Sequence, residues 1–508
     1  MTTLIRNVQV FTLGAGASLP DSVDVVIDGP QISAIGPDAG AGIDGPRTEI
    51  IDGTGHLLMP GLINAHFHSP VNHMKGALPS LPLEIFMLYE SPALDELLPT
   101  PREAYVRTML AALEMLKLGV TSVQDDAFFV PNPTPEIIDA VLQAYADCGI
   151  RARVALDQPN IPELDKLPFL AGMLPPNLRQ RLAKPPSFGM EPLLDAYRHL
   201  IERWHGFDGG RLKAAVSCSA PQRVTVPYFE ALDDLSRRHD LPFYAHMLET
   251  KLQRVYGVAH FEGRSLVRYV DDLGLISDRM NIIHAIWVDD HDLDLIARGG
   301  ATIAHNPISN LRLGSGVMPF RRIRDRGIPI CLGSDEAIAD DAVNMWSVAK
   351  MTGLIHNIAD PDYETWPSAA EVLHCLFAGG AHAMRETATL GAIEVGRQAD
   401  LVLLDLDTLA FTPLNDLGRQ LVYCESGSSV RLTMVAGEVV YAEGRIRRID
   451  EAAIRAEARE IHARQAAALR SAEATAAEWL PHYKAMYRRA SETDVGMNRW
   501  VGHAGVVR

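Results

Sequence analysis

The pattern of hydrophobic and polar positions divides the chain into three parts. From residue 3 to 59, short alternating segments rich in β-branched residues are separated by Gly and Asp, a pattern typical of strands and turns. From about 60 to 385, short apolar runs alternate with longer amphipathic segments, which indicates βα units around a parallel sheet. Alternating segments return at 391–407 and 430–446, and they predict strands that pair with those at the amino terminus.

The central part contains eight short apolar runs with the length and composition of buried strands. Eight βα units in roughly 320 residues fit a (β/α)8 barrel, a fold that spans about 200 to over 400 residues. The eight runs are GLINAH (61–66), TSVQDD (121–126), RARVALD (151–157), LKAAVSCS (212–219), PFYAHM (242–247), MNIIHAI (280–286), ATIAHN (301–306) and IPICLGSD (328–335).

We therefore predict an α/β fold in which a distorted (β/α)8 TIM barrel, residues 60–385, is inserted in a small β-sandwich domain. Residues 1–59 and 386–448 would form that domain together, because both segments carry short strands. Residues 449–508 would form a C-terminal helical extension. Their first part is rich in Ala, Glu and Arg, which predicts one or two helices packed on the outside.

Composition narrows the class of protein. The 508 residues include 64 Asp and Glu against 47 Lys and Arg, which gives a formal charge of −17. This balance gives no support for a nucleic-acid or membrane partner and suits a neutral or cationic small molecule. The five cysteines are scattered and include no CxxC pair, which indicates a reducing compartment. The sequence shows no signal peptide and no apolar run of ~18 residues, so we expect a cytoplasmic protein.

Histidines and carboxylates stand at the carboxyl ends of the predicted barrel strands. In a barrel these ends lie on one face, where barrel active sites are found, so residues far apart in the sequence converge. The first two histidines are spaced i, i+2, which places both imidazoles on one side of an extended strand. The strand-end residues are His66, His68, His246, Glu249, His284, His305 and Asp335.

Each of these residues taken alone has a structural explanation, such as a hydrogen-bonded core histidine or a helix cap. Their joint placement at strand ends, in the correct order, is what indicates a metal site. Imidazole nitrogens and a carboxylate suit Zn²⁺ or another divalent transition metal. His305 is left out of the ligand set because five protein ligands and a water would be crowded. His73 is interpreted as a pocket-wall or supporting residue, or as one without a direct role.

Several stretches together resemble the amidohydrolase superfamily. The closer likeness is to its cytosine-deaminase-like branch, which includes S-adenosylhomocysteine deaminase, guanine deaminase and atrazine chlorohydrolase. The resemblance covers about residues 3 to 445. It rests on LMPGLINAHFH (58–68), HMLE (246–249), IIHA (282–285), HNPISNLRLGSG (305–316), GSDEAIADD (333–341) and GAIEVGRQADLVLLD (391–405).

The resemblance implies one metal ion per chain. Two-metal members of the superfamily use a carboxylated lysine at the end of strand four, whereas this chain has Ser217 to Ala220 there and Lys213 at the start of the strand. We therefore expect one divalent transition metal, Zn²⁺ first, with Fe²⁺ or Mn²⁺ as alternatives. The ligands that match the family are His66, His68, His246 and Asp335.

The catalytic residues that the resemblance implies are Glu249, His284 and Asp335. A metal of this kind lowers the pKa of bound water from about 15.7 to roughly 7. Asp335 would take a proton from this water, and His284 would steady the attacking oxygen. Glu249 would protonate the ring nitrogen and then help a proton to reach the departing ammonia. The expected substrate contacts are His305, Asn310, Gln222 and Glu336.

The expected reaction replaces an amino group on a nitrogen heterocycle of the purine, pterin, pyrimidine or triazine type. Two departures keep alternatives open. Residues 217–226 lack the histidine of S-adenosylhomocysteine deaminases, and Glu336 follows Asp335 where atrazine chlorohydrolase has Asn. The alternatives are release of chloride or alkylamine from a triazine, hydrolysis of a cyclic amide, or a scaffold without catalysis. A scaffold would be expected to have lost ligands that are present here.

Apolar residues after strands one and two predict either the walls of a slot for a flat ring or loop core. The proline-rich stretch 157–200 predicts a long loop or subdomain over one barrel face. The family resemblance also implies a homo-oligomer. The candidate wall residues are Leu83, Phe86, Met87, Leu88, Tyr89, Phe128 and Phe129.

Overall fold

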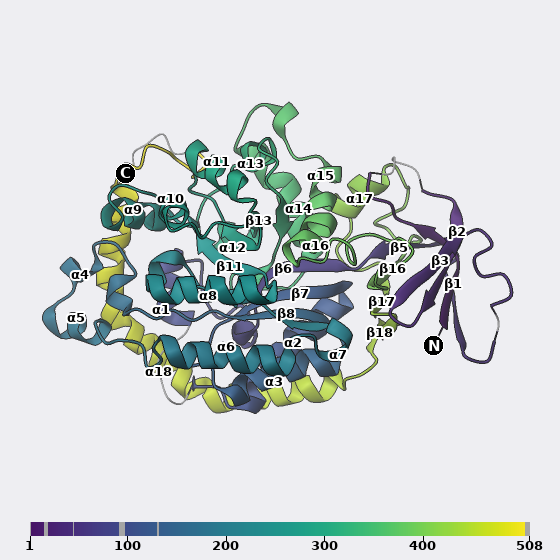
Figure 1. Ribbon diagram of the computed structural model, residues 1–508, viewed down its shortest axis with the longest axis horizontal. Helices are drawn as coiled ribbons and strands as arrows, with labels where there is room; N and C mark the ends of the chain where they lie inside the picture. Colours follow the sequence, from purple (N-terminus) through teal and green to yellow (C-terminus); the bar gives the residue numbers. More distant parts are fainter. Residues whose placement is uncertain (1, 15–18, 44, 91–96, 130–131, 503–508) are drawn as a thin grey trace.

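The computed structural model describes residues 2–14, 19–43, 45–90, 97–129 and 132–502 (Figure 1). A parallel barrel occupies the centre of the molecule, and a mixed sheet lies at its right-hand end in Figure 1. A long helix, coloured yellow, runs along the lower edge of the same view. Among the described residues, no helix is both long and apolar enough to cross a membrane.

The barrel contains the eight parallel strands that the sequence predicts. They are β6 Leu62–His68, β7 Val120–Ala127, β8 Arg151–Leu156, β9 Leu212–Ala214 with β10 Val216–Ser217, β11 Phe243–Met247, β12 Met280–His284, β13 Thr302–His305, and β14 Ile330–Leu332 with β15 Asp335–Glu336. β9 pairs with β8 while β10 pairs with β11, so these two short segments together make strand four. In the same way β14 pairs with β13 while β15 pairs with β6, which closes the ring.

Strand eight approaches strand one very closely at Gly333. A Cβ atom on Gly333 would lie 2.7 Å from the Cβ of His66, so only glycine fits there. The neighbouring Ser334 N donates to Asn64 Oδ1 over 3.0 Å, and Asn64 Nδ2 donates to Ser334 Oγ over 2.7 Å. These contacts fasten the last barrel strand to the first and bring Asp335 beside His66.

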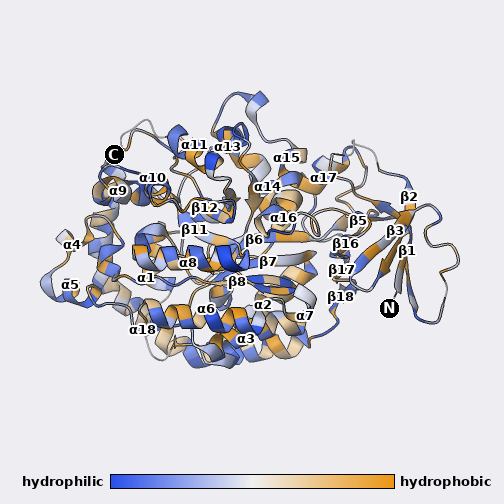
Figure 2. Ribbon diagram, in the orientation of Figure 1, coloured by the Kyte–Doolittle hydropathy of each residue, from blue (hydrophilic) through white to orange (hydrophobic). Residues whose placement is uncertain are grey.

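Amphipathic helices surround the barrel (Figure 1). On α6, Leu193, Tyr197 and Leu200 are buried at helical spacing, and Figure 2 shows hydrophilic and hydrophobic stretches alternating along this helix. The long helices after the strands are α2 Pro101–Lys117, α3 Pro135–Cys148, α6 Met190–Trp204, α8 Val226–His239, α11 Asp290–Gly299 and α14 Met345–Ile355. The shorter ones include α1 Leu83–Glu90, α9 Lys251–His260, α10 Leu266–Asp272, α12 Pro307–Arg312, α13 Phe320–Arg324, α15 Ala369–His374 and α16 Gly380–Ala383.

The amino- and carboxyl-terminal segments combine into one mixed sheet, as their alternating patterns predict. Its strands are β1 Thr2–Val10, β2 Ser22–Asp28, β3 Gln31–Gly36, β4 Thr48–Asp52, β5 His56–Pro60, β16 Leu401–Asp405, β17 Val430–Val435, β18 Glu438–Ala442 and β19 Arg445–Ile446. Hydrogen bonds link all nine in a single sheet, whereas we expected a sandwich. Both chain segments contribute to one apolar cluster, which includes Ile5, Val25, Leu401 and Met434.

Two further segments cover the barrel. Residues 157–200 form short helices rather than one long irregular loop. They contain the 3-10 helix η3 Glu163–Asp165, α4 Leu170–Met173 and α5 Pro176–Leu182 ahead of α6. The carboxyl-terminal segment forms a single helix of 42 residues, α18 Glu451–Glu492. Leu170 and Leu178 from the stretch share an apolar cluster with Trp479 and Tyr483 of α18. The stretch and α18 therefore pack together.

Candidate metal centre and active site

Five of the strand-end residues predicted from the sequence, His66, His68, His246, His284 and Asp335, form one cluster. The Nε2 atoms of His66 and His68 lie 3.4 and 3.5 Å from Asp335 Oδ1. His284 Nε2 lies 3.7 Å from Asp335 Oδ2. A nitrogen of His246 lies within 4.8 Å of nitrogens of His66 and His68. Residues from strands one, five, six and eight thus meet at the carboxyl ends of the barrel strands.

The cluster suits a divalent transition metal. His66 Nε2 is buried and has no hydrogen-bond partner among the described residues, although it faces a carboxylate and other imidazoles. Burial alone would raise the pKa of Asp335, but its interactions with His66, His284 and His68 hold that pKa well below its ordinary value. The cluster therefore offers imidazole nitrogens and an ionised carboxylate, a donor set that Zn²⁺ prefers.

Hydrogen bonds on the far side of two rings orient the imidazoles. His68 Nδ1 donates to the carbonyl of Asp126 over 2.5 Å, and His246 Nδ1 donates to the carbonyl of Ser219 over 2.7 Å. Each bond fixes the proton on Nδ1 and leaves Nε2 as the unprotonated nitrogen that faces the cluster. The two rings are thus set in the tautomer that binds a metal.

The backbone around the cluster adopts conformations that L-residues rarely take. The φ angles of Ser219, Leu248, His284 and Asp335 are 61°, 53°, 76° and 62°, and each residue lies at or just beyond the end of a barrel strand. Such left-handed residues cost free energy, and they persist where the surrounding structure holds them at functional sites. Two of the four, His284 and Asp335, are residues of the cluster itself.

Glu249 lies beside the cluster, next to His284. His284 Nε2 is 3.5 Å from Glu249 Oε2, and His284 Nδ1 donates to Asn310 Oδ1 over 2.9 Å. Burial raises the pKa of Glu249 well above its ordinary value, and the negative charge of Asp335 adds to the effect. Burial also lowers the pKa of His284 to about 4. A protonated carboxyl group next to a neutral imidazole is an arrangement that can donate and accept protons.

A cavity of about 560 Å³ opens from the cluster, within the range of about 300 to 1,000 Å³ that is usual for ligand pockets. His68, His246, Glu249, His284 and Asp335 form part of its wall. Five of the predicted apolar wall residues line it as well. They are Leu83, Met87, Leu88, Phe128 and Phe129, whereas Phe86 and Tyr89 pack in apolar clusters nearby.

The four residues predicted to contact the substrate lie at different positions relative to the cavity. Glu336 lines the cavity. Asn310 is buried and holds His284, and His305 Nε2 lies 3.2 Å from His356 Nε2. Gln222 is buried with no hydrogen-bond partner for its Oε1 among the described residues. His305, Asn310 and Gln222 do not belong to the described cavity wall, so their contact with substrate stays a prediction.

Sequence reasoning missed several residues of the cavity wall. Asp157 follows strand three, and Trp479 and Tyr483 come from α18. The position of Asp157 at a strand end was a signal that could have identified it. The helical pattern of α18 gave no sign that this helix reaches the cavity.

Lys213, the lysine of strand four, lies away from the cluster. Its Nζ donates to Glu386 Oε1 over 2.7 Å, next to Arg153 near the amino ends of the strands. The carboxyl end of strand four carries Ser217 instead, whose Oγ donates to Asp126 Oδ2 over 3.0 Å. This placement agrees with the expectation that no lysine bridges two metals.

A closed βα barrel whose strand ends carry a His/Asp cluster and an acid–base pair defines a metal-dependent hydrolase. The chain belongs to the amidohydrolase family, whose profile matches residues 57–440. The resemblance seen in the sequence is thereby confirmed. The protein is an enzyme of this family and hydrolyses carbon–nitrogen bonds other than peptide bonds.

Individual relatives agree with this assignment. The chain is 30% identical over 459 residues to a 5-methylthioadenosine/S-adenosylhomocysteine deaminase of Nitratidesulfovibrio vulgaris, covering 90% of this chain and 96% of that protein. An adenosine deaminase from Xanthomonas campestris with bound zinc matches at 26% identity with a TM-score of 0.77, covering 92% and 98%. Atrazine chlorohydrolase from Arthrobacter aurescens TC1, complexed with zinc, matches at 26% identity with a TM-score of 0.79, covering 90% and 99%.

Proposed function

We propose that this enzyme is a deaminase with one metal ion per chain, which replaces the exocyclic amino group of adenine-type nucleosides by oxygen. The proposal rests on the position of Glu249. Its Oε2 lies 3.5 Å from His284 Nε2, beside the His/Asp cluster. Deamination needs a proton donor for the ring nitrogen next to the point where water attacks, and this pair supplies one. Relatives named as deaminases of adenine nucleosides support the substrate class.

In this proposal the residues of the cluster have different roles as metal ligands and in proton transfer. His66, His68, His246 and Asp335 would hold the metal, which when bound supplies a strong oxygen nucleophile at neutral pH. Asp335 also accepts a proton from the attacking water. His284, oriented by Asn310, accepts a hydrogen bond from the attacking water at its Nε2.

Glu249 moves the protons on the substrate side. It donates its proton to the ring nitrogen, which makes the neighbouring carbon electrophilic, and a second proton then reaches the departing amino group. The bond to the amino nitrogen breaks as the new carbonyl forms, and ammonia leaves. The two hydrogens of the water end on the ring nitrogen and on ammonia, so the carboxyl groups return to their starting state.

The test is a product assay with metal-replete enzyme. We would measure ammonia and chloride released from adenine nucleosides, guanine, a pterin, cytosine and a chlorotriazine. We expect ammonia from adenine nucleosides, at rates well above those with the other ring systems. Metal-replete enzyme that releases no ammonia from any purine nucleoside would contradict the proposal.

Triazine hydrolysis is the second candidate function. The chlorohydrolase matches this chain in structure as well as the adenosine deaminase does, with TM-scores of 0.79 and 0.77. In addition, residues 217–226 lack the histidine expected in S-adenosylhomocysteine deaminases. Chloride or alkylamine release from the triazine in the same panel, without ammonia from nucleosides, would favour this function. A homo-oligomeric state stays a prediction in either case.

A further inference from the structure

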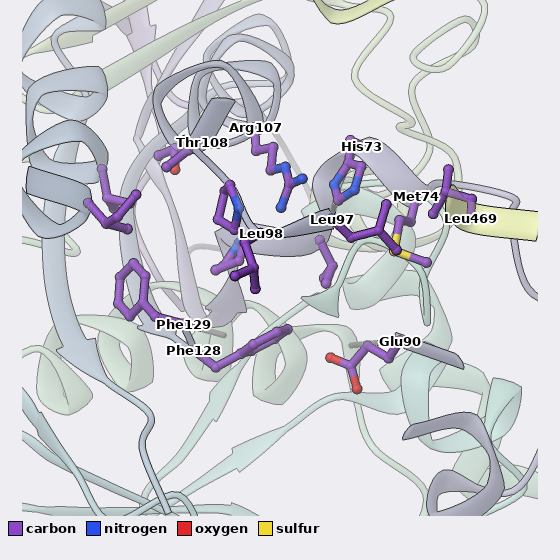
Figure 3. A pocket seen from close by; sticks show the side chains of 16 residues that line it. His73, Met74, Glu90, Leu97, Leu98, Arg107, Thr108, Phe128, Phe129 and Leu469 are labelled. Atoms are coloured by element: carbon purple, nitrogen blue, oxygen red, sulfur yellow. The ribbon is translucent and has the colours of Figure 1, made fainter. Parts of the chain in front are cut away.

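A second, small cavity lies beside the active-site cavity and contains an arginine (Figure 3). Its volume is about 60 Å³, and since one water needs only about 10–15 Å³, it has room for a few waters or one small ion. Most of its walls are apolar and come from the 3-10 helix η1 Ser69–Met74, from α2, from α3 and from the residues after β7. The polar side chains in its lining are His73, Glu90, Arg107 and Thr108.

The charge of Glu103 acts on Arg107, but Arg107 has no hydrogen-bonded counter-charge among the described residues of this cavity. The residue is only 7% exposed, and no hydrogen bond or ion pair joins it to any residue that the structure describes. Glu103, one turn earlier on α2, is used elsewhere: its Oε2 accepts from Thr100 N over 2.9 Å, and its Oε1 accepts from Arg464 over 3.3 Å. A buried cation without a partner is strongly unfavourable, so a ligand of opposite charge would stabilise this site.

His73 adds a second donor from a different element. Its Nδ1 is buried without a partner among the described residues, and in Figure 3 the Arg107 guanidinium points toward the His73 imidazole. Burial, together with the charge of Arg107, lowers the pKa of His73 well below its ordinary value. The neutral ring therefore offers one N–H beside the five of the guanidinium, and it adds no competing positive charge.

Glu90 does not neutralise Arg107. It lies on the other side of the cavity in Figure 3, where it also borders the active-site cavity. Phe128 and Phe129 likewise line both cavities. The two cavities are therefore neighbours that share part of one wall.

We propose that Arg107 and His73 form a binding site for a small anion of the carboxylate type, next to the active site. The planar guanidinium presents paired N–H groups that match the two oxygens of a carboxylate, and His73 can donate a further hydrogen bond. The apolar walls exclude water and strengthen these charge-assisted bonds. The carboxylate is either a substituent of the substrate that reaches past Phe128 and Phe129, or a free anion.

The test for the site uses the full chain and sodium formate as the probe. We expect the Tm of the wild type to rise saturably with formate, because a ligand that binds only the folded state stabilises it. In Arg107→Met the Tm without formate should be unchanged or higher, because a buried unpaired charge is gone. The affinity for formate should fall about tenfold or more, as loss of charge-assisted hydrogen bonds predicts.

Two further variants complete the test. Arg102 is on the same helix but is exposed and ion-paired with Glu457, so Arg102→Met should keep the full response to formate. Arg107→Lys keeps the charge and loses the planar fork, so it should fold and bind formate more weakly than the wild type. A wild type without a saturable response, or an Arg107→Met variant that responds like the wild type, would overturn the proposal.

A kinetic measurement then identifies the source of the anion. Of the experiments on this site, only this one rests on the proposed function. We would compare an adenine nucleoside whose 5′ substituent ends in a carboxylate with its neutral amide. If the substrate provides the anion, Arg107→Met raises KM for the acid about tenfold or more and leaves the amide unchanged. If a free anion binds, formate changes the kinetics of both substrates alike, and Arg107→Met removes that effect.

Discussion

Asp335 and Glu249 are both buried carboxyl groups next to His284, yet their surroundings drive them in opposite directions. Asp335 faces the imidazoles of His66 and His68, and these interactions outweigh the effect of burial and lower its pKa. Among the described residues, the carboxyl group of Glu249 accepts one long hydrogen bond, of 3.4 Å from Ser315, so burial and the charge of Asp335 raise its pKa. When two neighbouring carboxyl groups have opposite protonation states, the protonated one can act as the acid and the ionised one as the base.

Replacement of Glu249 by Gln tests this division directly. The amide keeps the size of the side chain but cannot exchange a proton, so kcat should fall about 10²- to 10⁴-fold. Steady-state ammonia release measures the effect. Metal content and Tm should match the wild type, and Glu163→Gln, at a half-exposed carboxylate on the cavity wall, is the control. A variant that keeps kcat within about tenfold would show that Glu249 is not the proton shuttle.

Metal content distinguishes the proposed ligands from other buried histidines. Elemental analysis of the wild type should give about one metal ion per chain, because the proposed ligands form one set around one position that stays open to water. His246→Ala removes one ligand and should lower that content to less than half. His305→Ala is the matched control, because His305 is a buried strand-end histidine that pairs with His356. Full metal content in His246→Ala would contradict the ligand assignment.

The sequence was sufficient to place the five cluster residues, but not their supports. The convergence of His66, His246 and Asp335 follows from barrel topology, because strand ends must share one face. The bond from His284 to Asn310 depends on the side-chain directions of two separate elements, the end of β12 and the helix α12, and no local pattern encodes it. For the same reason, the pairing of His305 with His356 could not be anticipated.

At the scale of elements, α18 has a role that its sequence pattern did not reveal. Ala472, Ala476, Trp479 and Tyr483 recur at helical spacing, and all four line the active-site cavity. The same face packs on the helices of the stretch 157–200. The alternation of Ala and charged residues predicted a helix correctly, but only the tertiary packing determines which surface it covers.

This placement predicts that Trp479 contributes to substrate size preference. Trp479→Ala should raise KM about three- to tenfold for nucleosides with a bulky 5′ substituent, through loss of aromatic contact. For a small substrate such as a free base, KM should change little, because it lacks the 5′ substituent that Trp479 would contact. Steady-state kinetics with both substrates measures the difference. Glu473→Gln, on the exposed face of α18, is the control, and equal effects on both substrates would contradict the prediction.

At the scale of the whole molecule, a buried ion pair joins the barrel to the mixed sheet. Arg151, the first residue of β8, donates to both oxygens of Asp400 over 2.6 and 2.9 Å, and both side chains are buried. Asp400 Oδ1 also accepts from Ala436 N over 2.8 Å. The GRQADLVLLD stretch is one of the sequence motifs that resemble the family. Its Asp400 forms the ion pair that joins the barrel to the mixed sheet. A contact between residues 249 positions apart is beyond any local pattern.

Asp400→Asn should therefore destabilise the protein by about 3 to 5 kcal/mol, because it leaves the buried Arg151 charge without its partner. Urea or thermal unfolding measures the loss. The matched control is Asp405→Asn, at the end of the strand β16 that begins directly after Asp400, which breaks the more exposed pair with Arg431 and should cost about 0 to 1 kcal/mol. Similar losses in the two variants would show that Arg151–Asp400 does not hold the two parts together.

A second link at the same end of the barrel makes stability depend on pH. Glu386 interacts with Arg153 and Lys213 on strands three and four. Burial alone would raise its pKa, but the charge of Arg153 and the hydrogen bond from Lys213 lower it to about 2, from 4.5 in the unfolded chain. Because the folded state binds this proton less readily, the contribution of Glu386 to stability is complete above about pH 5 and is lost as the pH falls toward 2.

Glu386→Gln tests this linkage, since the amide behaves at every pH much as the protonated acid does. The free energy of unfolding of the wild type should exceed that of the variant at pH 6 to 7, and the difference should shrink steadily as the pH falls to 3. Glu394→Gln, at an exposed carboxylate paired with Arg397, should show only a small difference throughout. A Glu386→Gln difference that stays constant with pH would mean that the ionised carboxylate does not link the barrel strands in the folded protein.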